Sequence, residues 1–323
     1  MLTIFAIPKP FKNHIATIQR NALKSWTLLR PRPEIILFGE EEGTAEIVAE
    51  LGLRHVPAVG RNENGTPLLN DLFDAAQNAA TNYLLCYVNA DIILLNDFMA
   101  AVEQVAAWRD RFLMVGRRWD IDIGQGLNFE QPNWERDLRA LTLARGKRRE
   151  PEWVDYFLFP RSLYKNIPPL ALGRLCWDNW LVWKARASQS AVVDASSVVL
   201  AIHQNHDYAH HPQGTIGVFW KGNEARQNLK LAGGWGHLRT IADAPHKMTS
   251  TGMERNVGSF FAPMRVVARR WRFLHSEVLT PSWYRLLRIT RPLRHPFGFR
   301  QEKVAGALPA SGDPRAESGG GNR

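Results

Sequence analysis

The sequence predicts an α/β protein built on a mostly parallel sheet that is flanked by helices. Three observations lead to this prediction. Short apolar segments alternate with longer amphipathic ones through the first half of the chain, one segment is apolar along almost its whole length, and the intervening segments are long enough for helices. Strands separated by helices of about 10 to 15 residues are typical of a parallel sheet.

The elements follow in a regular order through the first half. The amphipathic pattern predicts a helix over residues 11–29, with Ile15, Ile18, Ala22 and Trp26 on one face. The predicted strands are 3–7, 34–38, 54–56 and the segment from Tyr83, and the other helices are 44–51 and 68–80. Beyond residue 111 the pattern loosens, and it predicts strands over 112–116, 153–159 and 192–202 and a helix over 177–187.

The most informative segment runs from residue 83 to residue 95. It is apolar except for Asn89-Ala90-Asp91, and a run of this length indicates a strand buried on both faces. Asp91 follows at the point where such a strand ends, and ligands bind at the carboxyl ends of strands in open α/β sheets. A carboxylate there is costly unless a cation or a metal pairs with it. The alternative is an aspartate that caps the next turn.

Composition and charge bound the class of protein. The 45% hydrophobic and 22% charged content is that of a soluble protein, and no apolar stretch reaches the roughly 18 residues of a membrane span. The start lacks a basic region, which favours a first strand over a signal peptide. Cys86 and Cys176 lie in apolar contexts as buried thiols would in a reducing compartment, so we expect a cytoplasmic protein.

The positive charge is concentrated near the end of the chain. Nine arginines between residues 263 and 300 face one acid, Glu277, and they alternate with aromatic and aliphatic residues. This pattern predicts peripheral attachment to an anionic membrane surface, at its inner face. Packing on the folded domain, or non-specific RNA binding, is the alternative, and we expect no specific nucleic-acid site. We expect a folded domain over 1–245, a basic aromatic extension over 246–300 and a disordered tail over 301–323, which is rich in small residues.

Three polar groups stand at the ends of predicted elements. They are Asn89-Ala90-Asp91, Asp178 in Trp177-Asp178-Asn179, and His203 at the end of an apolar strand. A carboxylate and an imidazole at strand ends suit a divalent metal that holds phosphate oxygens. A second carboxylate among aromatic rings suits a general base whose pKa is tuned by burial.

This arrangement resembles the GT-A glycosyltransferases, close in style to the family 2 nucleotide-sugar transferases. Asn89-Ala90-Asp91 stands at the D-x-D position with Asn in place of the first acid, Asp178 matches the catalytic base, and His203 matches the metal histidine. The resemblance covers residues 2–234 and implies a Rossmann-like nucleotide-diphospho-sugar transferase fold over 1–245. It also implies an inverting hexosyltransferase, with Mn²⁺ or Mg²⁺ at Asp91 and His203. The chain departs from the family at Asn89 and in lacking Glu before Asp178.

The resemblance also implies binding residues for a nucleotide-sugar donor and for a glycan, lipid-linked or other hydroxyl acceptor. The donor residues it implies are Ala6, Ile7, Pro8, Glu40, Asn70, Asn89 and Asp91, and the acceptor residues are Asp155, Arg174 and Trp177. Glu40 could equally be a solvated charge, and Asn70 a helix cap. His206, Asp207, His210 and His211 form a polar cluster that could hold the metal or the diphosphate, and Trp220-Lys221 could supply a cation.

Three other classes compete with this interpretation. A nucleotidyltransferase would need a glycine-rich loop after the first strand, and residues 7–11 contain no glycine. A metallohydrolase could be built on His203 and the polar cluster around His206. A catalytically degenerate binding protein is the third alternative, because Asn89 replaces an acid, although Asp91, Asp178 and His203 are all present.

Overall fold

A computed structural model describes residues 1–206 and 222–267 of the chain. Asp207, His210, His211 and Trp220-Lys221 lie outside the described residues, as do most of the basic extension and the whole predicted tail. Among the described residues no helix is both long enough and apolar enough to cross a membrane.

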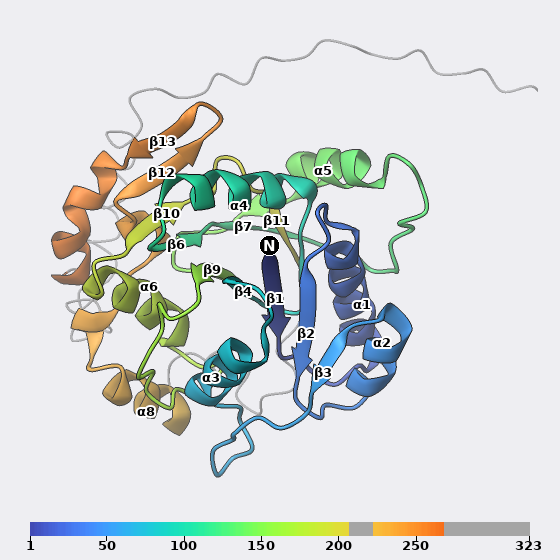
Figure 1. The fold of residues 1–323 in the computed structure, drawn as a ribbon, viewed down its shortest axis with the longest axis horizontal. Coiled ribbons are helices and arrows are strands. Elements are labelled where there is room, and N and C mark those ends of the chain that lie inside the picture. The colour runs from blue at the N-terminus through green and yellow to red at the C-terminus, as the bar shows by residue number, and fades with distance from the viewer. Residues whose placement is uncertain (207–221, 268–323) are drawn as a thin grey trace, which may run out of the picture. The chain divides into compact units, whose positions relative to one another are not determined.

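The main sheet has nine strands in the order β13-β12-β10-β6-β9-β4-β1-β2-β3. Its strands are β1 (Leu2–Ala6), β2 (Glu34–Phe38), β3 (Arg54–Val56), β4 (Leu84–Val88), β6 (Phe112–Val115), β9 (Tyr156–Pro160), β10 (Ala191–Asp194), β12 (His246–Thr249) and β13 (Gly252–Arg255). All run parallel except β9, which lies antiparallel between β4 and β6, and the edge strand β13. The predicted α/β class with a mostly parallel sheet is therefore confirmed (Figure 1).

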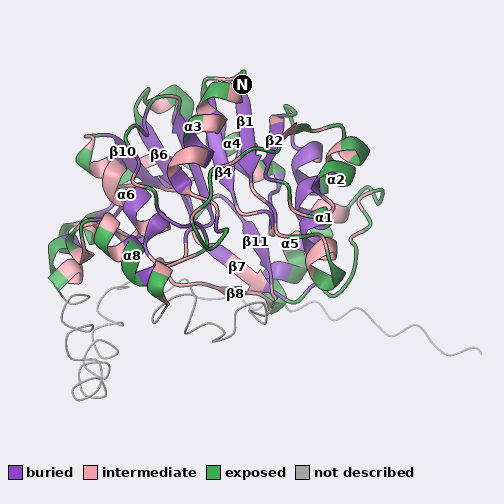
Figure 2. Ribbon diagram, turned by 90° about the horizontal axis from the view of Figure 1, so that it is seen from below, coloured by how far each residue is buried: buried purple, intermediate pink, exposed green. Residues whose placement is uncertain are grey.

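Two apolar cores lie on opposite faces of this sheet. Because successive side chains of a strand point to opposite faces, Ile4 of β1 belongs to one core and Phe5 to the other. The helices α1 (Asn13–Leu28), α2 (Thr44–Leu51) and α4 (Asn96–Trp108) contribute to the first core, and α3 (Leu69–Ala79) and α6 (Trp177–Ala187) contribute to the second. The central strands are accordingly buried, whereas the outer helix faces are exposed (Figure 2).

A second sheet of four strands lies beside the first, in the order β5-β11-β7-β8. Its strands are β5 (Ile92–Ile93), β7 (Arg118–Ile121), β8 (Lys147–Arg148) and β11 (Ala201–Gln204). The prediction of a single strand over 192–202 is wrong, because this part of the chain contributes to two strands, β10 in the main sheet and β11 in the second. A turn separates them, in which the Ser196 amide donates to Asp194 Oδ1 (2.9 Å).

Several elements were absent from the sequence-based prediction. They are α4, α5 (Trp134–Arg145), α8 (Asn223–Leu231), the strands β5, β7, β8, β12 and β13, and three short 3₁₀ helices at Trp235–His237, Ile241–Asp243 and Val257–Phe261. Because β12 pairs with β10, the main sheet includes residues beyond position 245. The strand predicted over 153–159 is β9, which begins three residues later.

Candidate functional site

The site forms where the two sheets meet, at the carboxyl end of β4. After Val88 the chain turns, with the Ile92 amide donating to Asn89 O (3.0 Å), and it leaves the main sheet to become β5. Asp91 is the last residue of this turn. His203 of β11 pairs with Ile92 on one side and with Asp120 of β7 on the other. This register places the His203 imidazole next to the Asp91 carboxylate.

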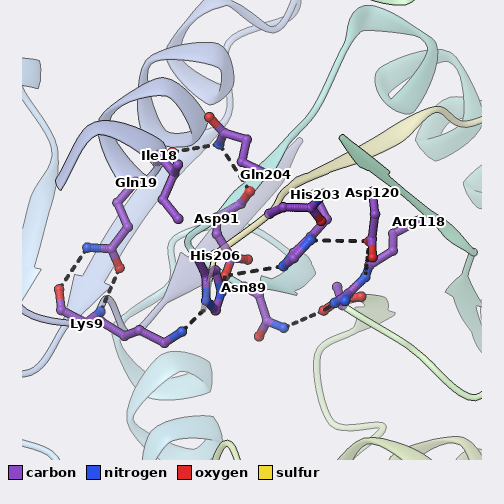
Figure 3. Close-up of polar contacts among 12 residues, drawn as sticks. Lys9, Ile18, Gln19, Asn89, Asp91, Arg118, Asp120, His203, Gln204 and His206 are labelled. Carbon is purple, nitrogen blue, oxygen red and sulfur yellow. Dashed lines mark hydrogen bonds and ion pairs between the residues drawn. The ribbon is translucent and has the colours of Figure 1, made fainter. Parts of the chain in front are cut away.

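Asp91, His203 and His206 form a three-residue cluster. One ligand atom from each lies within 4.8 Å of the others (Figure 3). His206 Nε2 is 3.1 Å from Asp91 Oδ2, and His203 Nε2 is 3.8 Å from the same oxygen. The sequence predicted Asp91 and His203 as the metal pair, and it placed His206 in a polar cluster that could hold a metal. The structure brings the three together.

The backbone at Asp91 is held by a buried glutamine. The side-chain amide of Gln204 donates to Asp91 O (3.2 Å) and to Ile18 O (2.7 Å), and it accepts a hydrogen bond from Asn21 (2.9 Å) (Figure 3). Gln204 is fully buried. These contacts join α1, the Asp91 turn and β11, so the Asp91 carboxylate is presented from a rigid support.

A second layer of charged residues supports His203. Its Nδ1 lies 3.2 Å from Asp120 Oδ1, and Asp120 is also paired with Arg118 (2.8 Å) and Arg149 (2.9 Å). Burial raises the pKa of Asp120, but His203 and Arg118 outweigh it, so that the pKa is lowered overall. A carboxylate at the far ring nitrogen of a histidine orients the other nitrogen toward a metal. Sequence reasoning missed Asp120 and Arg118 because it predicted no strand there.

Arg118 also links this layer to Asp155. Its Nη1 donates to Asp155 Oδ1 (2.9 Å), and the side-chain Nδ2 of Asn89 donates to the same oxygen (2.7 Å). The side-chain Oδ1 of Asn89 in turn accepts a hydrogen bond from the Tyr87 hydroxyl (2.9 Å). Asn89 therefore supports Asp155 through its nitrogen and Tyr87 through its oxygen.

Asp178 lies in the first turn of α6 and titrates near neutrality. Burial raises its pKa to about 7, the negative charge of Asp155 adds to that shift, and backbone hydrogen bonds and Arg118 oppose it. A carboxyl group with this pKa exchanges a proton at physiological pH, as a general base must. Arg118 connects Asp178 with the Asp91 cluster, because its charge opposes the rise in the pKa of Asp178 and it pairs with Asp120, which contacts His203.

The cluster fits a divalent cation. Asp91 Oδ1 is buried and has no hydrogen-bond partner among residues 1–206 and 222–267, so one carboxylate oxygen is left over for a ligand. Burial raises the pKa of Asp91, but the hydrogen bond from His206 and the charges of His203 and Lys9 lower it overall. Two imidazole nitrogens and one carboxylate suit ions such as Mn²⁺ or Zn²⁺ better than Mg²⁺.

Lys9 was not among the predicted site residues, yet it reaches the cluster. It follows Pro8, the last predicted donor residue, and its Nζ lies 3.3 Å from His206 Nε2 (Figure 3). Burial lowers the pKa of Lys9 overall, and the charge of Arg118 adds to this shift, whereas Asp91 and Asp155 oppose it. The signal in the sequence was a cation directly after the first strand, at the sheet edge where Asp91 lies.

The residues predicted to contact the donor differ in burial. Ala6 and Pro8 are buried and Ile7 is half-buried. Asn70, in the first turn of α3, has a buried Oδ1 without a hydrogen-bond partner among the described residues. Glu40 is exposed, whereas its neighbour Glu41 is turned inward and pairs with Arg61 (2.6 Å). Within the part of the chain that the structure describes, the buried Oε2 of Glu41 has no hydrogen-bond partner.

The predicted acceptor residues differ in their surroundings. Asp155 lies in the buried network described above. Arg174 pairs with Glu224 of α8 (2.7 Å), which also accepts a hydrogen bond from Asn62 (2.7 Å). Trp177 is buried and stands edge-on to Tyr87, with ring centroids 5.4 Å apart. Trp177 is thus part of the core under Asp178.

No family model and no curated protein matches the chain. The structure is similar to that of TarS from S. aureus in complex with UDP-GlcNAc, at 12% identity and a TM-score of 0.44 over 64% of this chain and 59% of that one. It is also similar to glucosyl-3-phosphoglycerate synthase from Mycobacterium tuberculosis in complex with Mn²⁺, UDP and phosphoglyceric acid, at 16% identity and a TM-score of 0.42 over 72% and 79%.

The chain thus spans about three fifths of the length of that TarS chain. Both proteins are GT-A glycosyltransferases of family 2, the group that the sequence resembles.

Proposed function

We propose that this protein is a glycosyltransferase that moves a sugar from a nucleoside-diphosphate sugar to a hydroxyl acceptor. The observation that carries the proposal is the presence of two chemical groups that one network of charged side chains connects. Asp91, His203 and His206 are arranged as ligands for a divalent cation, and Asp178 is a carboxyl group with a pKa of about 7. Arg118 belongs to both surroundings: its charge acts on Asp178, and it pairs with Asp120, which contacts His203.

Asp91, His203 and His206 would hold the cation against the donor diphosphate. Charge that develops on the departing diphosphate is neutralised when a divalent cation is bound there. Asp120 keeps the His203 ring oriented, and Gln204 keeps the Asp91 turn in place. The two histidines favour Mn²⁺ over Mg²⁺ as the working ion.

Asp178 would take the proton from the acceptor hydroxyl as that oxygen attacks the anomeric carbon. Near pH 7 about half of a carboxyl group with this pKa is ionised, so it can both accept the proton and release it. A single in-line displacement of this kind inverts the configuration of the sugar. The proposed donor contacts are Asn89, Asn70 and the residues after β1. At the nucleobase we propose Glu41 in place of Glu40, because Glu41 is the acid that turns inward.

The test is a panel of UDP-, GDP- and dTDP-sugars incubated with Mn²⁺ or Mg²⁺. We expect release of one nucleoside diphosphate, faster with an acceptor than with water alone, and loss of this release in Asp91→Ala. A metallohydrolase, which the three-ligand set also suits, would release product without an acceptor and would keep its activity in Asp178→Asn. A binding protein would take up the nucleotide sugar without turnover.

We further propose that the end of the described chain contacts an anionic membrane at its inner face. Val257, Phe260, Met264 and Val267 are exposed by 79%, 84%, 68% and 58%, at a spacing that places apolar side chains on one helical face. Arg265 fastens the same segment to the domain through Asp243 (2.7 Å), so the apolar side chains are held outward.

A groove of ≈ 560 Å³ beside this segment is lined by Arg186 and Arg239 together with Phe260 and Val266. Apolar side chains next to arginines suit the boundary between acyl chains and anionic headgroups. Attachment there would bring a lipid-linked acceptor within reach of α6, the helix that carries both Arg186 and Asp178.

A further inference from the structure

The backbone of Lys9 is held in place on both sides, and the proposed function assigns no role to its side-chain cation. Its backbone is clamped by Gln19 of α1, which accepts a hydrogen bond from the Lys9 amide (2.7 Å) and donates one to the Lys9 carbonyl (2.8 Å). With the backbone fixed at both groups, the side chain extends across the end of β1 to His206 (Figure 3). Its partner in that direction is the metal cluster.

The contacts at His206 Nε2 cannot all be satisfied at once. This nitrogen lies 3.3 Å from Lys9 Nζ and 3.1 Å from Asp91 Oδ2. A protonated Nε2 donates to Asp91 and repels the ammonium, whereas an unprotonated Nε2 accepts from Lys9 and has nothing to donate to Asp91. A metal ion needs the same lone pair that Lys9 uses. Lys9 and the cation are therefore alternative partners of one nitrogen.

We propose that Lys9 is a resident counter-charge that occupies the metal site and moves onto the donor diphosphate when the metal binds. The inference rests on the proposed function, since it takes the cluster to be a metal site and a diphosphate to be its ligand. Asp91 is the one carboxylate in the cluster, so the ammonium balances its charge when nothing is bound. Release from His206 leaves a cation within one side-chain length of the metal.

This arrangement makes the metal and the donor bind cooperatively. The metal alone must displace the Lys9 ammonium and then face its positive charge at close range, which weakens binding. A diphosphate supplies the negative charge that lets both cations stay. Binding of one ligand therefore raises the affinity for the other, as linkage requires.

The first measurement is Mn²⁺ binding in the absence of nucleotide. Binding is monitored by electron paramagnetic resonance, in which the signal of the free ion decreases as Mn²⁺ binds. We expect Lys9→Met to bind Mn²⁺ about tenfold more tightly than the parent, because the competing charge is gone. Lys12→Met is the matched control: it removes the same charge three residues away, from a side chain that is 60% exposed and paired with Glu42. This control should bind Mn²⁺ like the parent.

The second measurement is calorimetric titration of UDP and of GDP into protein with excess Mn²⁺. Lys9→Met should bind the preferred nucleotide about tenfold more weakly than the parent and Lys12→Met, because one diphosphate contact is lost. Equal Mn²⁺ affinity in Lys9→Met and the parent, with Asp91→Ala impaired, overturns the role of Lys9 and leaves the proposed function standing. If neither the parent nor Lys9→Met binds Mn²⁺, the metal-assisted function fails and this inference fails with it.

Discussion

Asp178→Asn removes the proposed base while keeping the size and shape of the side chain. At pH 5, two units below a pKa of about 7, roughly one Asp178 carboxyl in a hundred is ionised, so kcat of the parent should fall about tenfold per pH unit below 7. An aspartate with an ordinary pKa near 4 would leave kcat flat over this range. The Asn variant should lose about two to four orders of magnitude in kcat and should lack this acidic limb.

The assay is release of nucleoside diphosphate between pH 5 and 8.5. Mn²⁺ is kept saturating, so that loss of the metal at low pH does not itself lower kcat. Asp155→Asn should move the limb to lower pH, because the Asp155 charge raises the Asp178 pKa. Asp137→Asn, an exposed aspartate of α5, is the control that should leave the profile unchanged. A parent profile that is flat from pH 5 to 8, or an Asn variant with substantial activity, would refute the assignment.

The same pKa has a consequence for stability that needs no substrate. A raised pKa in the folded state means that the contribution of Asp178 to stability is complete below pH 3.8 and is lost as the pH rises through about 7. A shift from 3.8 to about 7 corresponds to at most about 4 kcal/mol, and less for this half-buried side chain because solvent screens it. Asp178→Asn should therefore melt at a higher temperature than the parent at pH 8 and at nearly the same temperature at pH 4. The same difference in melting temperature between variant and parent at both pH values would contradict a raised pKa of Asp178.

Three further predictions concern the surroundings of the site. Asp120→Asn should weaken Mn²⁺ binding about 10- to 100-fold with little change in melting temperature, because it removes the carboxylate that orients His203; unchanged affinity would exclude that role. Arg118→Met should cost about 3 to 5 kcal/mol in chemical denaturation, since it leaves the buried Asp155 carboxylate without its cation, whereas Asp120 keeps Arg149. A loss below about 1 kcal/mol would show that solvent reaches Asp155. The double variant Phe260→Ser with Met264→Ser should reduce co-sedimentation of the full chain with anionic vesicles, whereas Leu143→Ser, at an exposed apolar residue of α5, should not. Equal binding of the parent and both variants would exclude a membrane contact through this segment.

Local patterns in the sequence were enough to predict many helices and strands and to single out three residues as candidates for the chemistry. The bounds of β2, α2, β3 and α6 agree with the prediction, because the spacing of apolar residues within a short segment determines each of them. Asp91, Asp178 and His203 could be singled out because each polar side chain follows or begins an apolar element. The roles assigned to them stay predictions until the variants are measured.

The tertiary structure decided what depends on residues far apart in the chain. The apolar run 192–202 carries no sign that its two halves pair with strands of different sheets, and that division places His203 opposite Asp120. The elevated pKa of Asp178 arises from burial and from Asp155, neither of which the local sequence around Asp178 contains. Lys9 meets His206 across 197 positions of the chain. Strand pairing and burial follow from the free energy of the whole packed chain, so a site made of such contacts becomes visible only when the chain is folded.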